Sequence, residues 1–108
     1  MKLIELIDHL KTASKAQQLI SAQIPDVDFD QVEVYMKDHC GLNAEIAFFD
    51  ADKIPGNLII EVEGIKYENL FPLYMVQEMV EDYVQEFGNS VSDQEIAQKI
   101  LDYREHDA

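Results

Sequence analysis

The segment from residue 58 to residue 87 constrains the fold more than any other, because it joins two alternating runs to a long amphipathic helix. In residues 58–63 every second side chain is apolar, and two of the three intervening residues are glutamates, as in a strand with one buried face. Gly64 then permits a tight turn, because glycine adopts positive φ freely. Since the alternation resumes after this turn, residues 58–70 are predicted to form a β-hairpin.

A helix is predicted directly after the hairpin, over residues 72–87. Pro72 suits the first turn of a helix, whose N–H groups have no intrahelical partner, and Gly88 suits the position after the last turn. Apolar side chains share one stripe of this helix, whereas acidic side chains occupy the opposite side. The stripe consists of Leu73, Val76, Val80, Val84 and Phe87. One face of the helix is therefore expected to be core and the other to be anionic.

Local patterns predict four further elements and the fold class. Apolar spacings of three and four residues predict two helices before the hairpin, although Val32, Val34 and Tyr35 would also suit a strand. Ser92 and Glu95 form a capping-box pattern that begins the last helix. The predicted elements are helix 2–22, helix 29–39, strand 44–50 and helix 92–105. The order α-α-β-β-β-α-α indicates an α+β fold, with a small antiparallel sheet packed with helices in a single domain.

Acidity is the strongest compositional feature. The chain has 22 acidic and 8 basic residues and a net charge of −14; two of the acids and three of the lysines lie in residues 1–24, which leaves a net charge of −15 on residues 25–108. The electrostatic field of such a charge repels nucleic acid and anionic membranes and attracts basic proteins, and both effects become weaker as the salt concentration rises. The alternative is that the acidity serves solubility alone. With one cysteine and a charge-interrupted first helix, the chain is expected to be cytoplasmic.

No pattern predicts catalysis, a cofactor or a metal ion. Residues 26–30 begin like a calcium loop, but Gln31 stands where that loop needs glycine and Lys37 where it needs glutamate. The four glycines are too far apart to cradle a phosphate, and the histidines and Cys40 have no zinc spacing. We therefore predict no catalytic, cofactor-binding or metal-binding residues and no enzyme. An enzyme with a site built from ordinary carboxylates is the remaining alternative.

Two surfaces are candidates for binding a partner. If the helices cover one face of the sheet, the other face carries acids around two apolar side chains, as expected of an interface for a basic protein. The face predicted to be covered carries Ile46, Phe48, Leu58, Ile60, Val62 and Ile65. The first candidate surface is the opposite face, with Glu45, Phe49, Ile59, Glu61, Glu63 and Glu68. The second is the outer face of the 72–87 helix, with Met75, Glu78 and Asp82.

Each surface also has a simpler explanation. Helix 2–22 or a second copy of the chain would cover Phe49 and Ile59, and the helix face would be an ordinary solvated surface. If this sheet face is the interface, replacement of Phe49 by alanine should weaken binding of the partner and leave the midpoint of unfolding nearly unchanged.

The function indicated by these observations is that of a small acidic binding module or inhibitor that masks a basic surface of a partner protein. In size and acidity the chain resembles small immunity proteins and phage-encoded inhibitors that imitate DNA, and this resemblance implies a basic protein partner. It rests on no motif, so it assigns no residues. The alternative is a structural protein that forms a homodimer or larger homo-oligomer and is acidic only for solubility.

Overall fold

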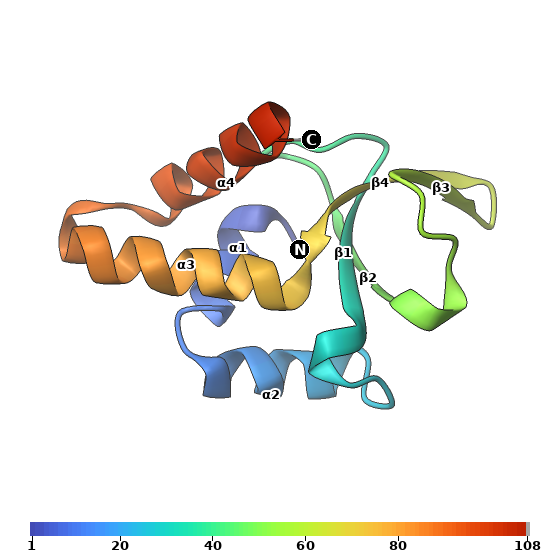
Figure 1. Cartoon of the computed structure of the whole chain (residues 1–108), viewed down its shortest axis with the longest axis horizontal. Coiled ribbons are helices and arrows are strands. Elements are labelled where there is room, and N and C mark those ends of the chain that lie inside the picture. Colours follow the sequence, from blue (N-terminus) through green and yellow to red (C-terminus); the bar gives the residue numbers. More distant parts are fainter. Residues whose placement is uncertain (108) are drawn as a thin grey trace.

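Four antiparallel strands form one sheet, in the order β2-β1-β4-β3, and helices pack against it (Figure 1). The computed structural model describes residues 1–107, apart from the side chains of Asn89 and Asp107. The predicted α+β class, with an antiparallel sheet packed with helices, is confirmed, although the sheet has four strands and not three. The strands are β1 (Val32–Lys37), β2 (Ile46–Asp50), β3 (Ile59–Val62) and β4 (Ile65–Pro72). The helices are α1 (Leu3–His9), α2 (Ala13–Gln23), α3 (Leu73–Phe87) and α4 (Asp93–Asp107).

The helix predicted over residues 29–39 is wrong. A short 3-10 turn (Phe29–Gln31) leads into β1, which lies between β2 and β4 and is buried on both faces. Val34 packs in the core formed with the helices, whereas Tyr35 is 2% exposed on the other face. The strand does alternate, because Val32, Val34 and Met36 point to the helices and the residues between them point to the other face. The helix was predicted because Val32, Met36 and Cys40 also follow Phe29 at helical spacings of three and four residues.

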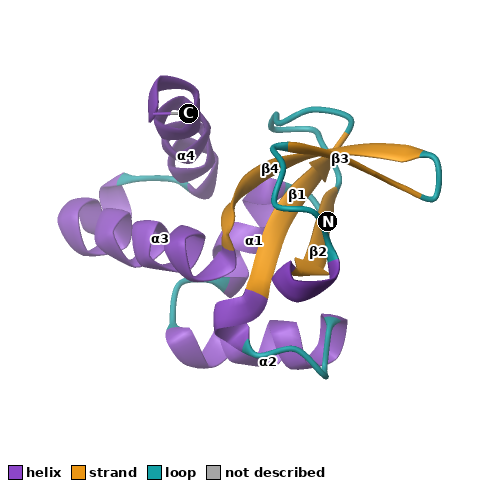
Figure 2. Cartoon of the chain, turned by 45° about the vertical axis from the view of Figure 1, so that its right-hand side comes forward, coloured by secondary structure: helices purple, strands orange, loops and turns teal. Residues whose placement is uncertain are grey.

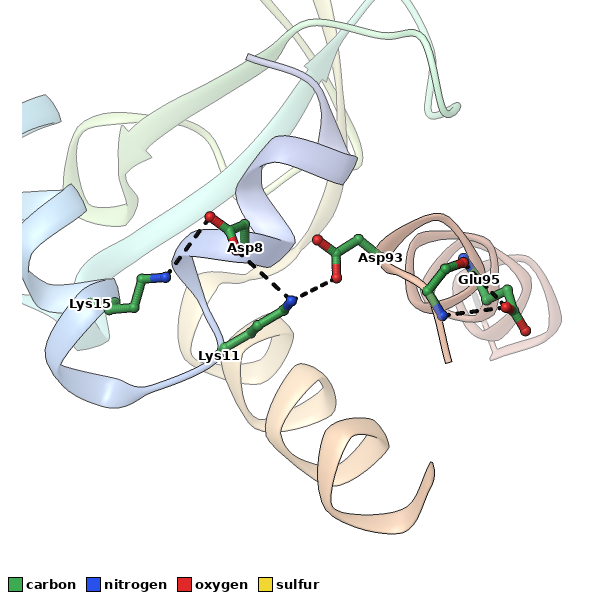
Figure 3. Close-up of polar contacts among 6 residues, drawn as sticks. Asp8, Lys11, Lys15, Asp93 and Glu95 are labelled. Carbon is green, nitrogen blue, oxygen red and sulfur yellow. Dashed lines mark hydrogen bonds and ion pairs between the residues drawn. The ribbon is translucent and has the colours of Figure 1, made fainter. Parts of the chain in front are cut away.

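The helix predicted over residues 2–22 is divided into α1 and α2. The break follows Leu10, and the Thr12 hydroxyl caps α2 by accepting a hydrogen bond of 3.2 Å from the Lys15 N–H. Lys11 lies between the two helices, with its Nζ 2.9 Å from Asp93 at the start of α4 and 3.8 Å from Asp8 (Figure 3). The break therefore lets α1 and α2 pack separately while a lysine links their junction to α4.

The hairpin and the two C-terminal helices follow their local signals. The turn between β3 and β4 has positive φ at Glu63 (53°) and Gly64 (81°), the combination of a two-residue hairpin turn. The capping box of α4 is confirmed: the Glu95 N–H donates to Ser92 Oγ at 3.1 Å, and the Ser92 N–H donates to Glu95 Oε1 at 3.3 Å. Pro72 ends β4 and does not lie in the first turn of α3.

The helices pack on one face of the sheet. At the centre of that face, β1 contributes Val32, Val34 and Met36 to the hydrophobic core. All four helices contribute to this core, and the hairpin of β3 and β4 extends beyond them (Figure 2). The opposite face carries Tyr35, Phe49 and Tyr67, whose rings are in contact. We refer to these three residues as the aromatic cluster.

The prediction of which hairpin side chains point toward the helices is wrong, and a β-bulge is the reason. Val34 pairs with Phe71, but the next residue, Tyr35, pairs with Asn69, so one residue of β4 is extra. From Asn69 back to Ile65, the side chains consequently point to the face opposite the one that a regular ladder would give. Ile60, which pairs with Tyr67, therefore lies on the side of the aromatic cluster and not in the core with the helices.

Candidate functional site

An open groove of about 700 Å³ lies beside the aromatic cluster. Its walls come from four segments: the end of α2 with the connection to β1, the end of β2, the loop after β2, and the tip of the β3–β4 hairpin. We call it the acidic groove. It is lined by Gln23, Ile24, Pro25, Asp26, Val27, Phe48, Phe49, Asp50, Lys53, Ile54, Pro55, Glu61, Val62 and Glu63.

Ring contacts position Phe49 at the groove. Its ring meets Tyr35 edge-on, with the centroids 5.5 Å apart, and meets Tyr67 in the same way at 5.2 Å. Both geometries are favourable for aromatic pairs. Phe49 is itself only half-buried, so part of its ring remains open to the groove.

The loop between β2 and β3 forms another wall of the groove and is held by two hydrogen bonds. The Tyr35 hydroxyl donates to the main-chain carbonyl of Asn57 at 2.9 Å. At the other end of the loop, Asp50 Oδ1 accepts from the Asp52 N–H at 3.0 Å and caps a short 3-10 turn, Ala51–Lys53. The first bond attaches the loop to the aromatic cluster and the second fixes the start of the loop, and between them Ile54 and Pro55 lie at the groove.

The groove carries a net negative charge. Four acidic residues line it, namely Asp26, Asp50, Glu61 and Glu63, against the single basic residue Lys53. Within residues 1–107, no ion pair closer than 4.0 Å involves any of these five side chains. The carboxylates therefore remain available for a cation that comes from outside the chain.

The structure brings together three of the nine predicted site residues, Phe49, Glu61 and Glu63. Ile59 pairs with Glu68 across β3 and β4, and neither lines the groove. Glu45 binds the N-terminal ammonium group through its Oε2 at 3.0 Å, and this contact lowers the pKa of its carboxyl. The second predicted surface lies apart from the groove, on α3, where Glu78 and Asp82 are exposed and Met75 is partly buried.

Glu68 has a structural role. Its carboxylate accepts a hydrogen bond of 2.8 Å from the Cys40 N–H, which is the main cause of a lowered pKa of Glu68. It thereby holds the connection between β1 and β2 against β4, beside a second pocket of about 520 Å³ under α4. This pocket is lined by Cys40, Gly41, Leu42, Glu68, Gln98, Leu101, Asp102, Arg104 and Glu105.

Cys40 lies in this connection, whereas the predicted helix 29–39 would have placed it at a helix C-terminus. Its Sγ lies 3.6 Å from the Asn69 carbonyl oxygen and 3.8 Å from that of Glu68. Burial raises the pKa of the thiol to about 12, and the nearby Glu68 carboxylate adds to the effect. A thiol with this pKa is protonated at neutral pH and is a poor nucleophile.

Sequence reasoning missed the apolar groove residues in connecting segments. Ile24 and Val27 flank Pro25 and Asp26, and Ile54 precedes Pro55 in a segment otherwise typical of turns. Apolar residues within such polar connections were the only available signal, since loops normally expose their side chains. Nothing in the sequence indicated that these two connections would meet at one groove.

Comparison with protein-family models, with curated proteins and with solved structures found no match to this chain. Among residues 1–107, no three or more His, Cys, Asp or Glu side chains are grouped so as to hold a metal ion. The helices in the same range are too short or too polar to cross a membrane.

Proposed function

We propose that this protein binds a basic, partly apolar segment of a partner protein in the acidic groove. The observation that carries the proposal is that four acidic residues line the same groove as the apolar residues Phe49, Ile54 and Val62. Carboxylates with no intrachain cation attract lysine and arginine, while apolar side chains supply the surface that is buried on contact. The carboxylates alone would not distinguish one basic protein from another, and the apolar side chains alone would not select a basic protein.

The charge of the whole chain supports the same proposal. A net charge of −14 on 108 residues accelerates encounter with a basic protein and disfavours nucleic acid as the ligand. A basic surface held in the groove would be closed to its own anionic ligands. Inhibition of a nucleic-acid enzyme or toxin is therefore the role that we propose, with the partner met in the cytoplasm.

The test compares two pairs of substitutions that change the charge equally. Glu61→Gln with Glu63→Gln removes two groove carboxylates, and Glu78→Gln with Asp82→Asn removes two from the outer face of α3. Proteins captured from a lysate of the source organism at low salt are identified, and the affinity of the purified partner is then measured by titration calorimetry. The groove pair should weaken binding about 2- to 30-fold, if each exposed ion pair contributes about 0.2–1 kcal/mol. The α3 pair should change it much less.

Two results would contradict the proposal. Equal weakening by the two pairs would mean that only net charge matters, and greater weakening by the α3 pair would place the interface on that helix. A chain that captures no basic protein and forms a dimer insensitive to salt would instead favour the homo-oligomer, because hydrophobic interfaces resist salt.

A further inference from the structure

The strand β3 ends the sheet with main-chain groups that no other strand uses. In the two-residue hairpin Val62 and Ile65 are the hydrogen-bonded pair next to the turn, and bonded and non-bonded pairs alternate along an antiparallel ladder. The bond from the Asn69 N–H to the Leu58 carbonyl, 2.7 Å long, follows the same alternation. The N–H and C=O groups of Ile59 and Glu61 therefore point away from β4. In the part of the chain that the structure describes, no strand lies beyond them.

The side chains along this edge favour one kind of occupant. Leu58 is 60% exposed and Ile59 is 52% exposed, so the edge presents two large apolar groups to solvent. Glu61 and Glu63 are also exposed there, and both line the acidic groove. Charged residues on an edge strand discourage pairing with like-charged strands. A second copy of this chain would bring the same glutamates and a net charge of −14, whereas a basic strand would find complementary charge.

We propose that the partner's basic segment binds as an additional antiparallel β-strand along the free edge of β3, an inference that rests on the proposed function. Strand addition of this kind uses main-chain hydrogen bonds for affinity and alternate side chains for specificity. The segment would place a lysine or arginine opposite Glu61 and a branched apolar residue opposite Ile59. Because the added strand runs antiparallel to β3, its sequence would read basic, any residue, branched apolar.

A synthetic peptide tests this binding mode directly. The probe is acetylated and amidated Lys-Thr-Lys-Thr-Ile-Thr, whose second lysine would face Glu61 and whose isoleucine would face Ile59. It is titrated into the isotope-labelled chain at low salt and followed by amide chemical shifts. We expect the largest shifts at residues 58–63, slowed hydrogen exchange of the Ile59 and Glu61 amides, and cross-strand contacts in the predicted register. Shifts confined to α3, or the absence of binding, would overturn the proposal.

The matched control is the same peptide N-methylated at the second lysine and at the isoleucine. It keeps the charge and side chains but loses two donors of the added strand, so its affinity should fall at least about tenfold. On the protein, Ile59→Pro removes an outward N–H that pairing with β4 does not use, and Ile59→Val keeps it. The proline variant should bind the unmodified peptide about 2- to 13-fold more weakly than the valine variant, as expected for the loss of one hydrogen bond, with both folds checked by their amide spectra.

The outcomes separate this inference from the proposed function. If N-methylation and Ile59→Pro have no effect while Glu61→Gln with Glu63→Gln still weakens the natural partner, the groove binds side chains without an added strand. If the peptide adds to β3 but the natural partner ignores the groove substitutions, the edge accepts strands and the proposed function is wrong. If Ile59→Pro does not fold, the N-methylated peptide alone decides the binding mode.

Discussion

The ring of Phe49 on β2 meets the ring of Tyr67 on β4 edge-on, with 5.2 Å between their centroids, although β1 lies between these strands in the sheet. Both rings lie on the face opposite the helices, where Tyr35 of β1 contacts Phe49 as well. The contact therefore links one wall of the acidic groove to the hairpin that supplies another wall.

Phe49→Ala should destabilise the fold as well as weaken binding of the partner. A half-buried phenylalanine with two ring contacts is expected to contribute about 2 kcal/mol, less than the 3–5 kcal/mol of a fully buried one. This differs from the expectation for a Phe49 that serves only the interface, whose loss would leave the midpoint of unfolding nearly unchanged. Urea unfolding measures the effect, and Phe49→Leu, which retains apolar volume, is the control. A loss below about 0.5 kcal/mol would mean that the aromatic cluster contributes little to stability.

Glu63→Asn should stabilise the chain while weakening its binding of a basic partner. Glu63 has a φ of 53° in a turn where asparagine before glycine is the preferred sequence. We expect a gain of about 0.5–1 kcal/mol in the free energy of unfolding. Glu61→Gln also removes a groove carboxylate, but it leaves the turn unchanged and should give no such gain. Equal stability of the Glu63→Asn variant and the native chain would refute the effect of the turn.

Cys40 should resist alkylation in the native state. With a pKa of about 12, the thiol is almost entirely protonated at pH 8, whereas an unfolded cysteine titrates near this pH. Iodoacetamide at pH 8 should therefore modify Cys40 at least about tenfold more slowly in the native chain than in urea. Mass spectrometry follows the reaction, and comparable rates in both conditions would show that the thiol is accessible and activated.

Glu68 should stabilise the fold at neutral pH and lose this effect in acid. Its folded-state pKa is lowered, chiefly by the hydrogen bond from the Cys40 N–H, so ionised Glu68 favours the native state above the ordinary pKa of 4.5. The contribution disappears as the pH falls through the lowered pKa. Glu68→Gln should thus reduce the free energy of unfolding at pH 7, and the difference from the native chain should shrink toward pH 2. A difference that is constant with pH would exclude this linkage.

Ionised Glu33 should have the opposite effect on stability to ionised Glu68. It lies across from Phe49 in the ladder, and burial raises the pKa of its carboxyl although the Asn69 amide donates to it at 3.3 Å. Ionised Glu33 therefore disfavours the native state above the raised pKa, and this cost vanishes below 4.5. Glu33→Gln should increase the free energy of unfolding at pH 7 and have little effect at pH 3. Destabilisation at pH 7 would mean that the bond to Asn69 outweighs the cost of burial.

Elements with a local signal could be predicted from the sequence. The turn at Glu63 and Gly64, the capping box of Ser92 and Glu95, and the end of α3 at Gly88 each depend on residues close together in the chain. Segment 29–39 carried two competing local signals, because β1 alternates like a strand while Val32, Met36 and Cys40 are also spaced as on one face of a helix. The composition likewise determined the strong negative charge of the chain.

Only the tertiary structure decided where the candidate site lies. Insertion of β1 between β2 and β4 set the order of the sheet, and the bulge opposite Val34 and Tyr35 reversed the side-chain directions of the hairpin. That reversal placed Ile60 with the aromatic cluster and separated Glu68 from Phe49. The sequence determined which residues alternate, but the face to which they point depends on pairing between distant strands, where one extra residue reverses every side chain beyond it.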